Sequence, residues 1–150
     1  MKPLVVLLTA FIIAAIILKL INNQLNFAFA ARIAMTAMLL FTAMGHFAFT
    51  KGMAMMVPKP VPFKEFMVYL TGFFEILAAA GLLLNSYYHI TGYALIVFFA
   101  VMLPANIYAA INHVDYQKGT TEGPGLKYLW FRVPLQILFI VWVYTAAILY

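Results

Sequence analysis

The sequence predicts an all-α membrane protein, an up-and-down bundle of transmembrane helices that forms a single integral membrane domain over residues 1–150. Hydrophobic residues make up 67% of the chain and charged residues 9%, whereas a soluble domain is about half apolar and about a quarter charged. So few charges cannot cover a water-soluble surface, which excludes a soluble enzyme. The apolar stretches do not alternate strictly with polar residues, which argues against an outer-membrane barrel and favours helices that satisfy their own backbone groups.

Five apolar stretches are long enough to cross a bilayer, since a spanning helix needs about 20 residues. The predicted helices cover about residues 4–21, 27–50, 66–84, 90–111 and 129–149. The first stretch also has features of a secretory signal, because Lys2 precedes it and Ala28-Phe29-Ala30 resembles a cleavage site. However, its apolar run and the gap that follows Lys19 are too long for that pattern. We therefore expect a membrane helix.

The later helices are bounded by proline, glycine and aromatic residues. Val57–Pro62 carries three prolines, cannot continue a helix, and is expected to be a stiff connector near the membrane surface. Tyr88 and Trp130 lie at the ends of the third and fifth helices, where such rings favour the headgroup level. Pro104 interrupts the fourth helix, and Gly119–Gly125 is expected to form a flexible loop before the fifth.

The basic residues predict the orientation of the helices. One side carries Lys2, Lys51, Lys59, Lys64, Lys118, Lys127 and Arg132, and the other only Lys19 and Arg32. The positive-inside rule places the N-terminus in the cytoplasm and the C-terminus outside, as in a multi-pass bacterial inner-membrane protein. Arg32 is expected to extend to the membrane surface. The net charge of +5 indicates contact with anionic lipids, and no basic array of the kind that binds nucleic acid is present.

Glu75 is the strongest functional signal, because it occupies the middle of the third predicted helix. A charged carboxylate at that depth costs about 2.5–3.5 kcal/mol on insertion scales. It is therefore expected to be paired, hydrogen-bonded or protonated. Gly72 and Ala79 lie on the same side of the helix and would let a neighbouring helix approach closely. Glu75 is thus either a proton-handling carboxylate or a buried structural one.

Polar residues on three further helices lie at comparable depths. Counting inward from the helix ends predicted to be cytoplasmic places Arg132, His46, Asn106, Gln136 and Glu75 about 5–13 Å deep. Arg132 and Gln136 are four residues apart and share one helix face. His46 is the natural proton donor or acceptor of this set, since histidine exchanges a proton near neutral pH. These polar side chains at similar depths predict either a polar pocket open towards the cytoplasm or a structural network that orders the bundle.

The sequence gives no sign of a metal or nucleotide site. The absence of cysteine excludes disulfides, iron–sulfur ligation and Cys-based zinc sites. A haem would need His46 and His113 at one depth on facing helices. The sequence contains no Glu-x-x-His motif, which a di-iron site in a helical bundle would require. The methionines that cluster between residues 35 and 56 are interpreted as adaptable packing rather than as copper ligands.

Several short segments occur in a recognisable order, namely Gly45-His46-Phe47, Val57–Pro62, Thr71–Leu77, Gly81–Leu84, Leu103–Ile107 and Trp130–Gln136. This ordered set resembles the DoxX-like family of small bacterial inner-membrane proteins, from about Arg32 to Ala146. The resemblance implies a four-helix bundle formed by predicted helices two to five, with the first helix added in front. The family takes its name from a subunit of a thiosulfate:quinone oxidoreductase, and its wider group includes assembly proteins. The shared polar residues are His46, Glu75, Asn106, Arg132 and Gln136.

Two hypotheses for the function follow. In the first, the protein binds a quinone or another lipid-like small molecule in a cytoplasm-facing polar pocket and is linked to redox metabolism. Arg132, Gln136, Asn106 and His46 would bind the ligand, and Glu75 with His46 would be catalytic by handling a proton. Electrons would then come from a separate partner protein. In the second hypothesis, the protein is a non-enzymatic assembly or scaffold subunit. A transporter is a weaker third reading, because no inverted repeat is visible.

Overall fold

The computed structural model describes residues 2–150, and these residues are all-helical apart from loops and one isolated bridge between Asp115 and Thr120. Five helices are long and apolar enough to cross a membrane. The elements are α1 (Lys2–Asn22), α2 (Phe27–Ala48), α3 (Thr50–Ala54), α4 (Lys64–Leu83), α5 (Tyr88–Ile111), the 3₁₀ turn η1 (Gly125–Tyr128), α6 (Leu129–Tyr144) and the π-helical turn η2 (Thr145–Leu149).

Helix α2 is two residues shorter than the helix predicted over residues 27–50. Helix α2 ends at Ala48, and Phe49 leaves helical geometry before the separate short helix α3. The hydroxyl of Thr50 donates to the His46 carbonyl at 2.7 Å and to the Phe47 carbonyl at 3.2 Å. These bonds satisfy backbone acceptors that a helix end leaves without a donor, and they fix the chain directly beside His46.

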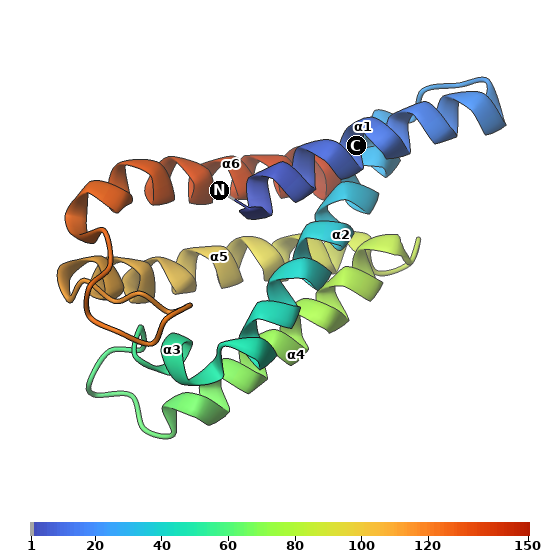
Figure 1. The fold of residues 1–150 in the computed structure, drawn as a ribbon. Coiled ribbons are helices and arrows are strands. Elements are labelled where there is room, and N and C mark those ends of the chain that lie inside the picture. Colours follow the sequence, from blue (N-terminus) through green and yellow to red (C-terminus); the bar gives the residue numbers. More distant parts are fainter. Residues whose placement is uncertain (1) are drawn as a thin grey trace.

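The helices pack around one apolar core (Figure 1). Helix α2 lies along α4, α5 lies beside α6, and α1 covers the outer side of α2. The core is formed by Met35, Met38 and Leu39 of α2, Ala78 and Leu82 of α4, Leu95 and Phe99 of α5, and Leu135, Phe139 and Val143 of α6. These residues fall in the middle of each helix and in the part that lies away from α3 and the 112–124 loop. We call the end that holds α3, residues 55–63 and residues 112–124 the basic end, because most of the lysines lie there.

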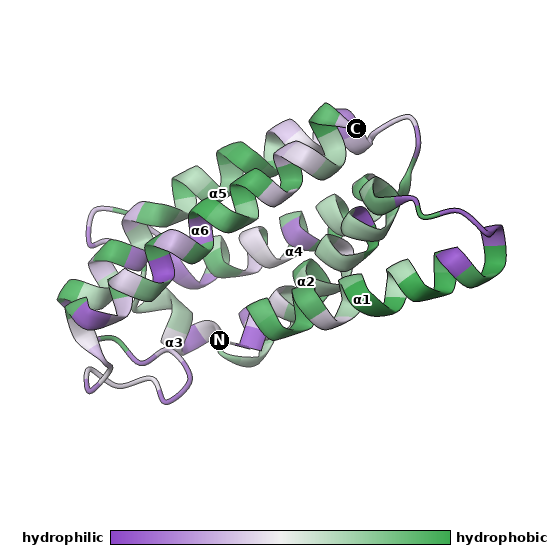
Figure 2. Cartoon of the chain, turned by 90° about the horizontal axis from the view of Figure 1, so that it is seen from above, coloured by the Kyte–Doolittle hydropathy of each residue, from purple (hydrophilic) through white to green (hydrophobic). Residues whose placement is uncertain are grey.

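Helix α1 packs against the bundle but is displaced along it. Leu7 is fully buried, and the ring of Phe11 meets Trp142 of α6 edge-on with ring centroids 5.2 Å apart. In Figures 1 and 2, α1 begins beside the middle of α6 and extends past the end opposite the basic end. The ribbon of α1 is coloured as hydrophobic over most of its length in Figure 2. The side chains that do not face the bundle are exposed, namely Ile12, Ile13, Ile16 and Ile17. Such a surface suits contact with lipid.

Candidate functional site

Close contact between α2 and α4 determines the position of Glu75. A Cβ atom built on Gly72 would lie 2.9 Å from the Cβ of His46, so only glycine fits between the two helices. About three turns nearer the start of α2, the Thr36 hydroxyl donates to the Ala79 carbonyl of α4 at 3.1 Å. The close helix approach expected at the small residues Gly72 and Ala79 is therefore confirmed. It places Glu75, between them on α4, against α2.

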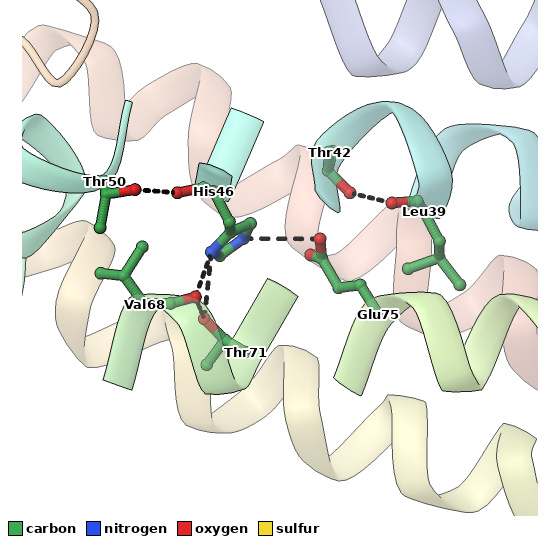
Figure 3. Close-up of polar contacts among 7 residues, drawn as sticks. All are labelled: Leu39, Thr42, His46, Thr50, Val68, Thr71 and Glu75. Carbon is green, nitrogen blue, oxygen red and sulfur yellow. Dashed lines mark hydrogen bonds and ion pairs between the residues drawn. The ribbon is translucent and has the colours of Figure 1, made fainter. Parts of the chain in front are cut away.

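His46 and Glu75 form a nearly buried pair at this contact (Figure 3). The Nε2 atom of His46 lies 3.4 Å from Oε2 of Glu75, and Glu75 is only 5% exposed. Within residues 2–150, Oε2 is buried and no donor forms a hydrogen bond with it. Its one polar neighbour is therefore Nε2 of His46, at a distance longer than that of a good hydrogen bond. Thr42, drawn above Glu75 in Figure 3, directs its hydroxyl to the Leu39 carbonyl instead.

The surroundings of the other ring nitrogen determine where the histidine proton lies. Nδ1 of His46 is 3.1 Å from the Val68 carbonyl oxygen, which can only accept a hydrogen bond. It is also 3.0 Å from the Thr71 hydroxyl, whose own proton is donated to the same carbonyl at 2.8 Å. Both neighbours therefore require a proton on Nδ1. In a neutral ring, Nε2 is then an acceptor, so Nε2 and Oε2 can form a hydrogen bond only if one of the two atoms carries a proton.

A second polar cluster ties α5 to α6. Arg132 donates from Nε to the side-chain oxygen of Asn106 at 3.3 Å, and Asn106 donates to the side-chain oxygen of Gln136 at 3.2 Å. Gln136 in turn donates to the Phe99 carbonyl. That carbonyl lies next to the Ala100 carbonyl, which Pro104 deprives of its helical donor. The chain of bonds thus crosses the interface where α5 is weakened.

The structure divides the five predicted site residues between these two clusters. His46 and Glu75 meet at the α2–α4 contact, and Arg132, Asn106 and Gln136 meet at the α5–α6 contact. Among the described residues, no hydrogen bond or ion pair joins one cluster to the other. His46, Asn106 and Arg132 lie nearer the basic end, and Glu75 and Gln136 lie near the middle of their helices, beside the apolar core. That they line one pocket stays a prediction.

Two hollows lie at the basic end. The smaller, about 30 Å³, is bordered by Asn106, Arg132 and Tyr128 and has room for about one water molecule. The larger, about 520 Å³ and open to the surface, lies between α3 and the start of α4 and is lined mainly by Met55, Phe63, Phe66 and the lysines 51 and 64. Only the smaller hollow is bordered by predicted ligand-binding residues.

Replacing Gln136 by leucine is expected to lower the free energy of unfolding by about 1–2 kcal/mol, because the Phe99 carbonyl and the Asn106 amide would lose their partners. Denaturation in mixed detergent micelles measures the change. Ile137, the next residue on α6, is 55% exposed, so Ile137→Leu is the matched control and should change stability by less than about 0.5 kcal/mol. Equal effects of the two substitutions would contradict the structural role of Gln136.

Sequence reasoning missed two polar residues. Thr71 precedes Glu75 by one helical turn, and that spacing alone could have indicated a shared face. Arg32 was expected to extend to the surface, and this prediction is wrong. The residue is 8% exposed and stacks on the Tyr88 ring with its Cζ atom 3.9 Å from the ring centroid. Its spacing of 14 residues from His46, close to four turns of helix, places both on one stripe of α2.

Comparison with known proteins gives a family but no activity. Residues 35–147 match the model of a family described as "Domain of unknown function (DUF8561)". The match begins within α2, so it includes both polar clusters and leaves out α1 and Arg32. No curated protein and no solved structure matches the chain.

Proposed function

The chain belongs to this family of unknown function, and we propose that it binds a lipid-soluble small molecule with a polar head, a quinone in the first place, and exchanges a proton with it through His46 and Glu75. The observation that carries the proposal is the contact of 3.4 Å between Nε2 of His46 and Oε2 of Glu75 in a nearly buried setting, where the tautomer of His46 leaves Nε2 facing Oε2 without a proton of its own. A purely structural carboxylate would be expected to accept several good hydrogen bonds. Glu75 instead has one loosely placed neighbour on Oε2, and no donor holds this oxygen in place.

The ligand side of the proposal rests on the α5–α6 cluster. Arg132 uses Nε for Asn106, and its two Nη groups are suited to donate to a carbonyl oxygen of the ligand head. The hollow beside it admits one oxygen atom rather than a ring, since ligand pockets usually measure about 300–1,000 Å³. Binding therefore requires the 112–124 loop to move away from Arg132. Reduction of a quinone to a quinol takes two electrons and two protons, and a partner redox protein would supply the electrons.

We place the protein in the bacterial inner membrane with the basic end in the cytoplasm. Five helices are long and apolar enough to span, and the lysines of residues 51–64 and 118–127 lie at one end of the bundle. The positive-inside rule assigns that end to the cytoplasm. The resemblance to DoxX-like proteins supports the same placement and the link to quinones, and we propose a common origin with them.

The alternative function is that of a non-enzymatic assembly or scaffold subunit. The observation that favours it is the connection of α5 to α6 by three consecutive side-chain hydrogen bonds, which is what a network that only orders the helices would show. In that case neither Arg132 nor Glu75 would affect a bound small molecule.

The test is mass spectrometry of the small molecules that copurify in mild detergent, combined with an assay of quinone-linked proton uptake. Wild-type protein is expected to carry a quinone, and Arg132→Ala to lose it. Glu75→Gln is expected to keep both the fold and the quinone, because the new amide can donate to Nε2 of His46, but to lose proton uptake. The exposed Lys127 provides the control substitution Lys127→Ala, which should behave like wild type.

Two results would contradict the proposal. The first is a preparation that holds only bulk phospholipid and is unchanged in Arg132→Ala, which favours the scaffold function. The second is a Glu75→Gln variant that retains full proton uptake, which removes Glu75 from the proton path.

A further inference from the structure

We propose that Arg32 forms an anion-binding site at the end of the bundle opposite the basic end, and that it binds the phosphate of a membrane phospholipid. Arg32 is 8% exposed. Within residues 2–150, its Nε and Nη1 atoms are buried and have no hydrogen-bond acceptor. Burying a charged group without a partner is strongly unfavourable. The guanidinium therefore requires an acceptor that these residues do not provide.

The acidic residues of the chain cannot provide this acceptor. The four carboxylate side chains are Glu65, Glu75, Asp115 and Glu122. Glu75 lies beside His46, Glu65 is in the first turn of α4, and Asp115 and Glu122 are in the loop after α5, all three of the latter at the basic end. None lies within 4 Å of Arg32, nor does the carboxylate of Tyr150, among the described residues. The counter-charge has to come from another molecule.

The surroundings of Arg32 suit an oxyanion such as a phosphate. The guanidinium Cζ lies 3.9 Å from the centroid of the Tyr88 ring and 5.4 Å from that of Phe29, so aromatic rings surround the group. Nε and Nη1 have no acceptor among the described residues, and adjacent N–H donors along one edge of a guanidinium, such as those of Nε and Nη2, match two oxygens of a phosphate. The adjoining turn between α4 and α5 carries Asn85 and Ser86, both exposed, which add polar groups at the same end.

The depth of Arg32 favours a lipid over a soluble anion. Arg32 lies five residues into α2, or about 7 Å from the helix start, which corresponds to the boundary between headgroups and acyl chains. Exposed aromatic rings of Phe27 and Tyr87 flank the position, as is typical of the membrane interface. A phospholipid can therefore place its phosphate at Arg32 while its acyl chains follow the apolar outer surface of the helices.

The experiment measures lipid binding to the full chain in detergent by native mass spectrometry, with thermal unfolding in parallel. The probes are phosphatidylglycerol, diacylglycerol with the same acyl chains, and inorganic phosphate. Wild type is expected to retain one phosphatidylglycerol and to gain thermal stability from it, and diacylglycerol should do neither. Arg32→Met should weaken phosphatidylglycerol binding about tenfold or more, as expected for loss of charge-assisted hydrogen bonds.

The variants separate this site from a structural role. Without lipid, Arg32→Met should unfold at the same or a higher temperature than wild type, because an unpartnered buried charge has been removed. Arg32→Lys keeps the charge but not the two-pronged geometry and should bind with intermediate affinity. Lys19→Met removes an exposed charge from α1 near the same end and should leave binding unchanged. None of these substitutions should affect the copurified quinone, so the two proposals can fail separately.

Three outcomes would overturn the proposal. If Arg32→Met retains phosphatidylglycerol as well as wild type does and is less stable with or without lipid, Arg32 is a packing residue. If inorganic phosphate stabilises wild type as much as the phospholipid does, the site binds a soluble anion instead. If Arg32→Met changes the oligomeric state and not lipid binding, the partner is a carboxylate of another protein subunit.

Discussion

Replacing His46 by leucine is expected to lower the free energy of unfolding by about 3–5 kcal/mol, because Glu75 would remain buried without its one polar neighbour on Oε2. The loss should be smaller for Glu75→Leu, which leaves a neutral ring nitrogen unpaired rather than a carboxylate. The double variant His46→Leu/Glu75→Leu should recover most of the stability, since both members of the pair are then apolar. Denaturation in mixed detergent micelles gives all three values.

The double-mutant cycle isolates the interaction between the two side chains. A coupling free energy of about 2 kcal/mol or more is expected for a buried pair. His89, which is exposed at the start of α5, provides the control substitution His89→Leu, with an expected change of less than about 0.5 kcal/mol. Strictly additive effects of the two single substitutions would show that His46 and Glu75 do not interact in the membrane.

The second large effect is expected at Gly72, where alanine should destabilise the protein by about 1–3 kcal/mol. The added methyl group would lie 2.9 Å from the Cβ of His46 and 3.4 Å from the Phe47 ring. Because the His46 Cβ is attached directly to the backbone of α2, the clash can be relieved only by moving the two helices apart. That movement would also lengthen the contact between His46 and Glu75 and should reduce the proposed proton uptake.

Gly45→Ala is the matched control, because Gly45 precedes His46 on α2. Its added Cβ would meet only the end of the flexible Met53 side chain, at 3.4 Å. Alanine is preferred over glycine in helices by up to about 1 kcal/mol, so this substitution should be neutral or stabilising. The comparison is made by thermal unfolding in the same detergent. If Gly72→Ala is as harmless as Gly45→Ala, the helices do not pack closely at His46.

The helices were predictable because apolar stretches of spanning length are marked directly in the sequence. The predicted span over residues 90–111 differs from α5 by two residues at its start and none at its end. The larger errors fall where a side chain alters the helix end. Thr50 bonds to carbonyls of α2 and separates α3 from it, and the last predicted helix ends in the π-helical turn η2. The helix propensities of these residues indicate neither the break before α3 nor the π-helical turn.

The polar residues were predictable in identity and depth, because position along a helix advances by a fixed rise per residue. Their partners were not. Asn106 and Gln136 were assigned to the same layer as Glu75, yet they bind each other across α5 and α6 while Glu75 faces α2. Arg32 was expected to extend outward and is instead buried beneath Tyr88.

The sequence by itself therefore determines that the chain is helical, that five helices can cross a membrane, and which polar side chains lie within them. The tertiary structure alone decides which helix each of these side chains faces. The physical reason is that lipid is as apolar as the interior of the bundle. A helix that is apolar on all sides carries no pattern to distinguish its inward face, and its rotation is determined by close contacts such as the one between Gly72 and His46.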